Sequence, residues 1–125
     1  MTVTDAELLE LADAVADRSY APYSSFPVGC AVLTHDGKVI EGVNVENAAY
    51  PLGVCAERTA FARAVAEGYA PGDFVAAAIT ASPCGGCPQW FLEMGVGRVV
   101  FRNGDRVVVM TVDELLPESF ELSSP

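Results

Sequence analysis

Two short motifs contain the side chains best suited to chemistry in this chain. The first is Cys55-Ala56-Glu57, and the second is Pro83-Cys84-Gly85-Gly86-Cys87. Their three cysteines can bind a tetrahedral zinc ion as thiolates and leave its fourth position open. Glu57, two residues after the first cysteine, adds a carboxylate that can transfer protons beside the open position. The motifs therefore predict a hydrolytic zinc site with Cys55, Cys84 and Cys87 as metal ligands.

Two other uses of these cysteines remain open. A structural zinc site normally has four protein ligands, but the remaining cysteine and the single histidine, Cys30 and His35, stand in different local settings. We expect Cys30 to be a buried core residue and His35 to be a solvated loop residue. A Cys-x-x-Cys pair is also typical of redox chemistry, although that chemistry does not require Glu57 beside a further cysteine. A hydrolytic site accounts for both motifs together.

The composition is typical of one globular domain that covers residues 1–125. Of the 125 residues, 51% are hydrophobic, which is enough to form a core, and the formal net charge is -10. Such an acidic chain is unsuited to phosphate contacts with nucleic acid and fits a small neutral ligand. The N-terminal residues lack the pattern of a secretion signal, and no apolar stretch is long enough to span a bilayer. We therefore expect a cytoplasmic protein with free cysteines and no membrane contact.

Helices and strands are expected to alternate along the chain, with short connections. Apolar residues at helical spacing predict a first helix over residues 5–19, with Thr4 and Glu7 as its capping pair. Further helices are expected at residues 55–67 and 87–94, and strands at 28–33, 39–45, 74–81, 96–101 and 107–111. Asp36-Gly37 and Asn103-Gly104 predict hairpin turns, so the last two strands should be antiparallel. A frayed tail is expected after residue 122.

The cysteines are expected at the N-terminal ends of two helices. Cys55 begins one predicted helix, and Cys84 and Cys87 share the first turn of the next, where unpaired N–H groups stabilise thiolates. Pro88 restricts this arrangement, because proline is accepted only in the first turn of a helix. Three thiolates also exceed the charge of a zinc ion by one. Arg58 can offset that excess by donating hydrogen bonds to sulfur.

Beyond the zinc motifs, a match to a known family extends almost from end to end. The chain resembles the zinc-dependent cytidine deaminases of the short, all-cysteine, homotetrameric type, in which Cys-x-Glu precedes Pro-Cys-x-x-Cys. The segments that carry this resemblance are Tyr20-Ala-Pro-Tyr23-Ser-Ser-Phe26-Pro-Val-Gly29, Gly42-Val-Asn44-Val-Glu46-Asn47-Ala-Ala-Tyr50, Val54-Cys55-Ala-Glu57-Arg58-Thr59-Ala60, Ser82-Pro-Cys84-Gly-Gly-Cys87, and Leu115-Leu116-Pro117 with Phe120. Pro88 is a departure, because that family usually has an arginine at this position.

The resemblance implies a fold and an activity. The implied fold is a three-layer α/β/α domain with a five-stranded mixed sheet in the order 2-1-3-4-5. The implied activity is hydrolytic deamination of cytidine and deoxycytidine to uridine and deoxyuridine in pyrimidine salvage, with one zinc ion per subunit and active sites shared within a homotetramer. The predicted hairpin between the last two strands favours the free-nucleoside branch, because nucleic-acid-editing deaminases typically have parallel strands there.

The same resemblance assigns a role to each candidate site residue. Glu57 is implied to transfer protons from the attacking water to N3 of cytosine and to the departing amine. Phe26 is implied to pack on the base, and Asn44 and Glu46 to bind the ribose hydroxyls. The other implied substrate contacts are the backbones of Ala56 and Cys84 and the side chains of Tyr50 and Phe120, the last two contributed across subunits.

Other interpretations remain open for these residues and for the whole chain. Taken alone, Phe26 and Phe120 could be core or interface residues, and Asn44 and Glu46 could form the polar face of a strand end. Two further functions are deamination of a cytosine-containing antibiotic such as blasticidin S and a non-catalytic zinc-stabilised binding module. The polar pair at 44 and 46 favours the nucleoside, because ribose hydroxyls need polar partners.

Overall fold

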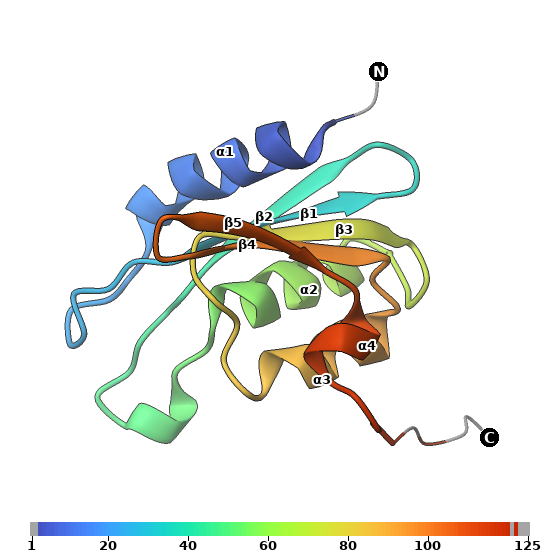
Figure 1. The fold of residues 1–125 in the computed structure, drawn as a ribbon. Helices are drawn as coiled ribbons and strands as arrows, with labels where there is room; N and C mark the ends of the chain where they lie inside the picture. The colour runs from blue at the N-terminus through green and yellow to red at the C-terminus, as the bar shows by residue number, and fades with distance from the viewer. Residues whose placement is uncertain (1–2, 121, 123–125) are drawn as a thin grey trace.

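A mixed β-sheet with helices on both faces forms the protein. The computed structural model describes residues 3–120 and 122, and within this part the sheet has five strands in the order β2-β1-β3-β4-β5. Helix α1 (Asp5–Val15) covers one face, and α2 (Ala56–Ala66) and α3 (Cys87–Met94) cover the other (Figure 1). This confirms the predicted three-layer α/β/α fold and strand order. The tail expected after residue 122 lies outside the described residues.

The strands combine antiparallel and parallel neighbours. Strand β1 (Gly29–Thr34) is antiparallel to both β2 (Val39–Val43) and β3 (Phe74–Ile79). Strand β3 is parallel to β4 (Arg98–Asn103), which is antiparallel to β5 (Arg106–Met110). Both predicted hairpins are confirmed, and Gly37 and Gly104 supply the positive φ angles, 88° and 62°, that these turns require.

Strand and helix bounds shift by a few residues from the prediction. The strand expected at residues 96–101 runs from Arg98 to Asn103, because Val96 and Gly97 connect α3 to the sheet through N–H bonds to the carbonyls of Phe91 and Phe74. The helix expected over residues 5–19 ends at Val15 and continues as a 3-10 turn, Ala16–Arg18. The predicted capping pair of Thr4 and Glu7 is confirmed.

The two zinc motifs meet their helices in different ways. Cys55 is the N-cap of α2, as expected. The prediction that Cys84 and Cys87 share the first turn of a helix is wrong for Cys84, because α3 begins only at Cys87 and the Gly85-Gly86 turn precedes it. The N–H of Cys87 donates to the carbonyl of Cys84 at 3.1 Å, which closes that turn. Pro88 is in the first turn of α3, as predicted.

Two short helical segments were not expected from the sequence. A 3-10 turn, η2, spans Tyr50–Leu52, and α4 spans Val112–Leu115 after the last strand. Helix α4 carries a capping box, in which the side chain of Thr111 accepts from the N–H of Glu114 and the Glu114 side chain accepts from the N–H of Thr111. The Thr-x-x-Glu spacing is a sequence signal that could have predicted this helix.

Close packing of α2 against the sheet fixes the position of the first zinc motif. The helix has buried alanines on its sheet-facing side, at positions 56, 60 and 64. Gly42 of β2 permits this approach, because a Cβ atom there would lie 2.4 Å from the Ala60 nitrogen and 2.6 Å from the Ala56 oxygen. Phe61 packs edge to face on Phe74 and Phe91, which joins α2, β3 and α3 in one core.

A helix able to span a bilayer is absent from the described part of the chain.

Candidate active site and metal centre

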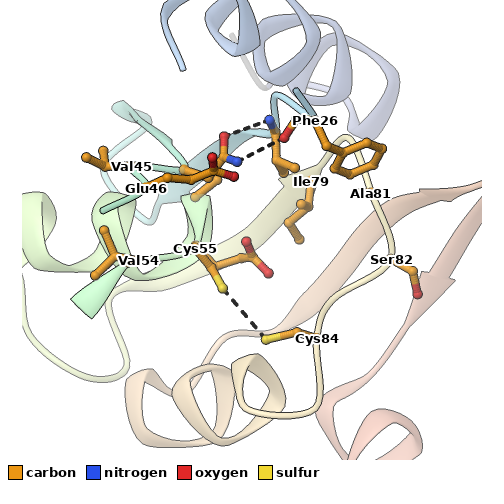
Figure 2. A pocket seen from close by; sticks show the side chains of 14 residues that line it. Phe26, Val45, Glu46, Val54, Cys55, Ile79, Ala81, Ser82 and Cys84 are labelled. Carbon is orange, nitrogen blue, oxygen red and sulfur yellow. Dashed lines mark hydrogen bonds between the residues drawn. The ribbon is translucent and has the colours of Figure 1, made fainter. Parts of the chain in front are cut away.

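The structure brings the three cysteines of the two motifs together. Their sulfur atoms all lie within 4.8 Å of one another, and those of Cys84 and Cys87 are 3.4 Å apart. The sulfurs of Cys55 and Cys84 are 3.7 Å apart (Figure 2). A tetrahedral ion with zinc–sulfur bonds of about 2.3 Å requires sulfurs roughly 3.8 Å apart. All three are free thiols, so the cluster fits zinc ligation through three thiolates.

The thiols of Cys55 and Cys87 differ in pKa because one is stabilised as a thiolate by the other. A hydrogen bond from Cys87, with a further one from Cys84, lowers the pKa of the Cys55 thiol from 9.0 to about 6, against the opposing effect of burial. The same hydrogen bond to Cys55, with burial, raises the pKa of Cys87 well above its usual range. One thiolate is therefore stabilised by its thiol neighbours, and a metal cation at the centre is needed to hold all three as thiolates.

Glu57 lies beside this cluster in the first turn of α2. The residue is only 3% exposed, and it lines the same pocket as Cys55 and Cys84. A carboxylate so placed can reach a ligand in the pocket while being shielded from bulk water. This position suits proton transfer at an open metal site.

Arg58 lies against the turn that contains the other two cysteines. A Cβ atom at Gly86 would lie 2.6 Å from an Nη atom of Arg58, so the guanidinium occupies the space that a side chain at position 86 would fill. Its Nε is buried and has no hydrogen-bond partner among the described residues. A buried, unpaired N–H next to a thiolate cluster is suited to donate to sulfur once the thiols have lost their protons.

A cavity of about 280 Å³ opens above the cysteines. It lies near the lower end of the size range of small-molecule sites. Its walls come from four parts of the chain that are distant in sequence (Figure 2): Phe26, Val28, Asn44, Val45, Glu46, Gly53, Val54, Cys55, Ala56, Glu57, Ile79, Ala81, Ser82 and Cys84. The predicted site residues 26, 44, 46, 55, 56, 57 and 84 are thus in one pocket, and Cys87 is buried beneath it.

The polar end of the pocket is formed by Asn44 and Glu46. Asn44 accepts at Oδ1 from the N–H of Val28 at 2.8 Å and donates from Nδ2 to the carbonyl of Phe26 at 3.0 Å. Glu46 accepts at Oε1 from the N–H groups of Tyr23 and Ser24 at 3.0 and 3.1 Å. Hydrogen bonds from the Ser24 hydroxyl and N–H and from the Tyr23 N–H lower the pKa of Glu46.

Two predicted substrate contacts lie outside the main pocket of the single chain. Tyr50, 75% exposed, lines an adjoining hollow with Tyr23, Ser24, Glu46, Asn47 and Gly53. Phe120, 68% exposed, lines a separate hollow with Gln89, Leu92, Glu93 and Leu122. Cys30 is buried in the core and His35 is exposed in a turn, as expected.

Sequence reasoning missed several residues that shape the site. Val28 and Ile79 line the apolar side of the pocket, and both look like ordinary strand residues in the sequence. Ser19 and Ser24 contact Asn44 and Glu46 through their hydroxyls, although each is about 20 residues or more away along the chain. No sequence signal marks these serines, because a hydroxyl in a loop is usually solvated.

Comparisons with known proteins agree with the geometry. A family model described as "Cytidine and deoxycytidylate deaminase zinc-binding region" matches residues 2–103. The chain is 44% identical over 114 residues to the cytidine deaminase of Sporosarcina psychrophila, covering 83% of this chain and 82% of that protein. It is 43% identical over 123 residues to the cytidine deaminase of Halalkalibacterium halodurans, covering 90% and 91%.

A solved structure shows the same arrangement of the backbone. The crystal structure of cytidine deaminase from Burkholderia pseudomallei superposes with a TM-score of 0.88 at 46% sequence identity, covering 94% of this chain and 99% of that one. The predicted zinc ligands fall within the zinc-binding region that the family model describes. Because that region spans most of the chain and the relatives match nearly all of it, the chain belongs to the cytidine and deoxycytidylate deaminase family of zinc-dependent enzymes.

Proposed function

We propose that this enzyme hydrolyses free cytidine and deoxycytidine to uridine and deoxyuridine with release of ammonia. The observation that carries the proposal is one pocket with the thiolate cluster and Glu57 at one end and the Asn44–Glu46 pair at the other. The first end suits hydrolysis of an aminopyrimidine ring, and the second suits the hydroxyls of a sugar.

The charge of the pocket supports a nucleoside over a nucleotide. Among the described residues that line it there is no lysine or arginine, whereas Glu46 and Glu57 both line it. A phosphate group is normally bound by cationic side chains or a helix N-terminus, and a carboxylate repels it. Glu46 at the polar end therefore opposes a 5′-phosphate that lies near it.

The residues divide the reaction between them. Cys55, Cys84 and Cys87 would hold the zinc ion, which would supply the Lewis acidity that makes water reactive toward C4 of cytosine. Glu57 takes a proton from that water and delivers protons to N3 and to the departing amino group. One water and one cytidine thus give one uridine and one ammonia. Arg58 donates toward the thiolates and offsets their excess negative charge.

The remaining residues orient the substrate. Phe26 packs on the base, and Asn44 and Glu46 bind the sugar hydroxyls. The backbones of Ala56 and Cys84, which both line the pocket, contact the base. Ala56 is the first residue of α2, and the N-terminal N–H groups of a helix lack acceptors within it.

We also propose that the pocket is completed in a homotetramer. The exposed aromatic and aliphatic side chains near the pocket, Tyr23, Phe26, Tyr50 and Leu52, form a surface that a second subunit could cover. Phe120 then approaches the pocket of another subunit. Free thiols suit a reducing cytoplasm, where pyrimidine salvage takes place.

A substrate panel tests the proposal. Ammonia release is measured for cytidine, deoxycytidine, deoxycytidylate and blasticidin S, with zinc quantified per subunit. The proposal expects the first two to be turned over with one zinc per chain, and deoxycytidylate to be a poor substrate. Preferred turnover of blasticidin S would favour the antibiotic deaminase instead, and zinc without any turnover would indicate a binding module.

A further inference from the structure

We propose that Ser19 and Ser24 are positioning residues for the sugar-binding end of the pocket. Their hydroxyls hold Asn44 as a hydrogen-bond donor and Glu46 as a hydrogen-bond acceptor toward the same ligand. The inference rests on the proposed function, because it concerns how the pocket recognises the hydroxyls of a nucleoside.

The partners of Asn44 determine which of its groups face the ligand. Its Oδ1 accepts from the N–H of Val28 at 2.8 Å and from the hydroxyl of Ser19 at 2.5 Å, so both lone pairs of the oxygen are used. Its Nδ2 donates one hydrogen to the carbonyl of Phe26 at 3.0 Å (Figure 2). A flipped amide would place N–H against N–H and oxygen against oxygen. Asn44 is therefore left with one free N–H, and it can only donate.

The partners of Glu46 produce the opposite polarity. Its Oε1 accepts from the backbone N–H groups of Tyr23 and Ser24, and its Oε2 accepts from the Ser24 hydroxyl. These contacts keep the carboxylate ionised, as the lowered pKa of Glu46 reflects. An ionised carboxylate can only accept, so a ligand group that contacts both side chains must accept from Asn44 and donate to Glu46. A hydroxyl does both.

Two backbone hydrogen bonds hold the segment without the serine hydroxyls, although Ser19 Oγ also lies 3.3 Å from the carbonyl of Asn44 and Ser24 Oγ accepts from the N–H of Phe26 at 3.1 Å. Tyr20 N–H donates to the carbonyl of Asn44 at 3.1 Å, and Glu46 N–H donates to the carbonyl of Tyr20 at 2.8 Å. These bonds keep residues 19–24 beside residues 44–46 without either hydroxyl. Removing the Ser19 hydroxyl therefore frees an acceptor lone pair on Asn44 while the backbone stays in place. The expected loss is in recognition of the sugar and not in the fold.

Substrate truncation tests this role. Ser19→Ala is compared with wild-type enzyme on cytidine and on 2′,3′-dideoxycytidine, which lacks the 2′- and 3′-hydroxyls of the sugar and keeps the 5′-hydroxyl. If turnover of dideoxycytidine is slow, its inhibition constant against cytidine is measured instead. We expect KM for cytidine to rise about 3- to 10-fold, as for loss of one hydrogen bond, with kcat within about twofold. The values for dideoxycytidine should be unchanged. Ser19→Thr, which retains the hydroxyl, should recover most of the loss.

Control variants separate positioning from a general effect on the loop. The side chain of Ser25 makes no hydrogen bond within the described residues, so Ser25→Ala should match wild-type enzyme on both nucleosides. Ser24→Ala acts on Glu46 from an exposed turn and also removes the acceptor of the Phe26 N–H. The part of its penalty that disappears with dideoxycytidine is due to Glu46, which keeps the test decisive if Ser19→Ala fails to fold.

Two results would overturn the inference. One is an equal penalty on cytidine and dideoxycytidine, which would mean that the serines support the pocket in general. The other is no penalty on either nucleoside. A wild-type enzyme that turns over no cytidine would instead contradict the proposed function, and the two failures are therefore distinguishable.

Discussion

Glu57 combines burial with access to the pocket. The residue is only 3% exposed, yet it lines the cavity beside Cys55. Burying a carboxylate is unfavourable unless a neighbouring charge or ligand compensates. A cation held by the three cysteines would provide that compensation.

The first prediction concerns Glu57 itself. Glu57→Gln should keep zinc at one per chain but lower kcat at least about 100-fold, because the amide fills the same space and cannot transfer protons. Metal analysis and steady-state kinetics on the same preparation provide the measurement. Cys55→Ala, Cys84→Ala and Cys87→Ala are the contrasting set, since each should lose the metal. Robust cytidine turnover by Glu57→Gln would exclude Glu57 as the proton carrier.

The second prediction concerns Arg58. Pro88 stands in place of the arginine usual in the family, and the guanidinium of Arg58 lies against the Cys-x-x-Cys turn and lowers the pKa of Cys55. Arg58→Ala should weaken zinc binding about 10- to 100-fold, as for other residues that support metal ligands. Competition with a chelator measures the affinity, and kcat is measured at saturating zinc.

Arg63→Ala is the matched control for Arg58. Arg63 lies on the same helix and forms an exposed ion pair with Glu67, away from the cysteines. Its loss should leave zinc affinity unchanged. If Arg58→Ala behaves in the same way, the helix N-termini alone offset the charge of the thiolates.

At the scale of elements, the distance between α2 and β2 sets the position of the Cys55-Ala56-Glu57 motif. The two elements approach closely at Gly42, where any side chain would meet the backbone of Ala56 and Ala60. The helix cannot yield locally, because its other buried residues pack on the sheet and on α3. A change at Gly42 therefore moves the whole helix, together with Cys55 and Glu57.

The third prediction follows from this contact. Gly42→Ala should lower the free energy of unfolding by about 1–3 kcal/mol, as for overpacking of a core, and should also reduce zinc affinity. Denaturant unfolding and chelator competition measure the two effects. Gly104→Asn is the control, because position 104 lies in an open turn with a left-handed backbone that asparagine can adopt. This change should alter the free energy of unfolding by about 0.5 kcal/mol or less. Wild-type behaviour of Gly42→Ala would show that α2 can shift without cost.

At the scale of the whole molecule, the proposed tetramer determines whether a single chain has a complete pocket. Tyr50 and Phe120 are both largely exposed, and neither lines the main cavity of its own chain. Aromatic side chains exposed in this way are typical of an interface. Their burial between subunits would close the pocket and exclude water from it.

The fourth prediction is that four chains assemble and share their pockets. Sedimentation at assay concentrations should show a tetramer, and a fully active monomer would reject the proposal. Co-expression of Glu57→Gln with Phe120→Ala gives a sharper test, because random mixing should leave roughly a quarter of the pockets with both native residues. Activity should then exceed that of the two parents combined. Activity equal to the parental sum would place Phe120 outside the neighbouring pocket.

The local sequence determined the chemistry of the site and most of the elements around it. Three cysteines and Glu57 stand in two short motifs, and their ligand chemistry does not depend on distant residues. Turn residues such as Gly37 and Gly104 fixed the hairpins, because their positive φ angles are a local requirement. The strand order and the roles of Phe26, Asn44 and Glu46 came from the family resemblance.

Only the tertiary structure decided how the distant segments meet. Helix α3 starts at Cys87, and Cys84 lies in the turn before it. This arrangement brings both sulfurs to the sulfur of Cys55 at the start of α2. Arg58 occupies the space beside Gly86, and Ser19 and Ser24 donate hydrogen bonds to Asn44 and Glu46. Each of these contacts joins residues about 20 to 30 positions apart. Such contacts follow from sheet register and helix packing, which no short stretch of sequence specifies.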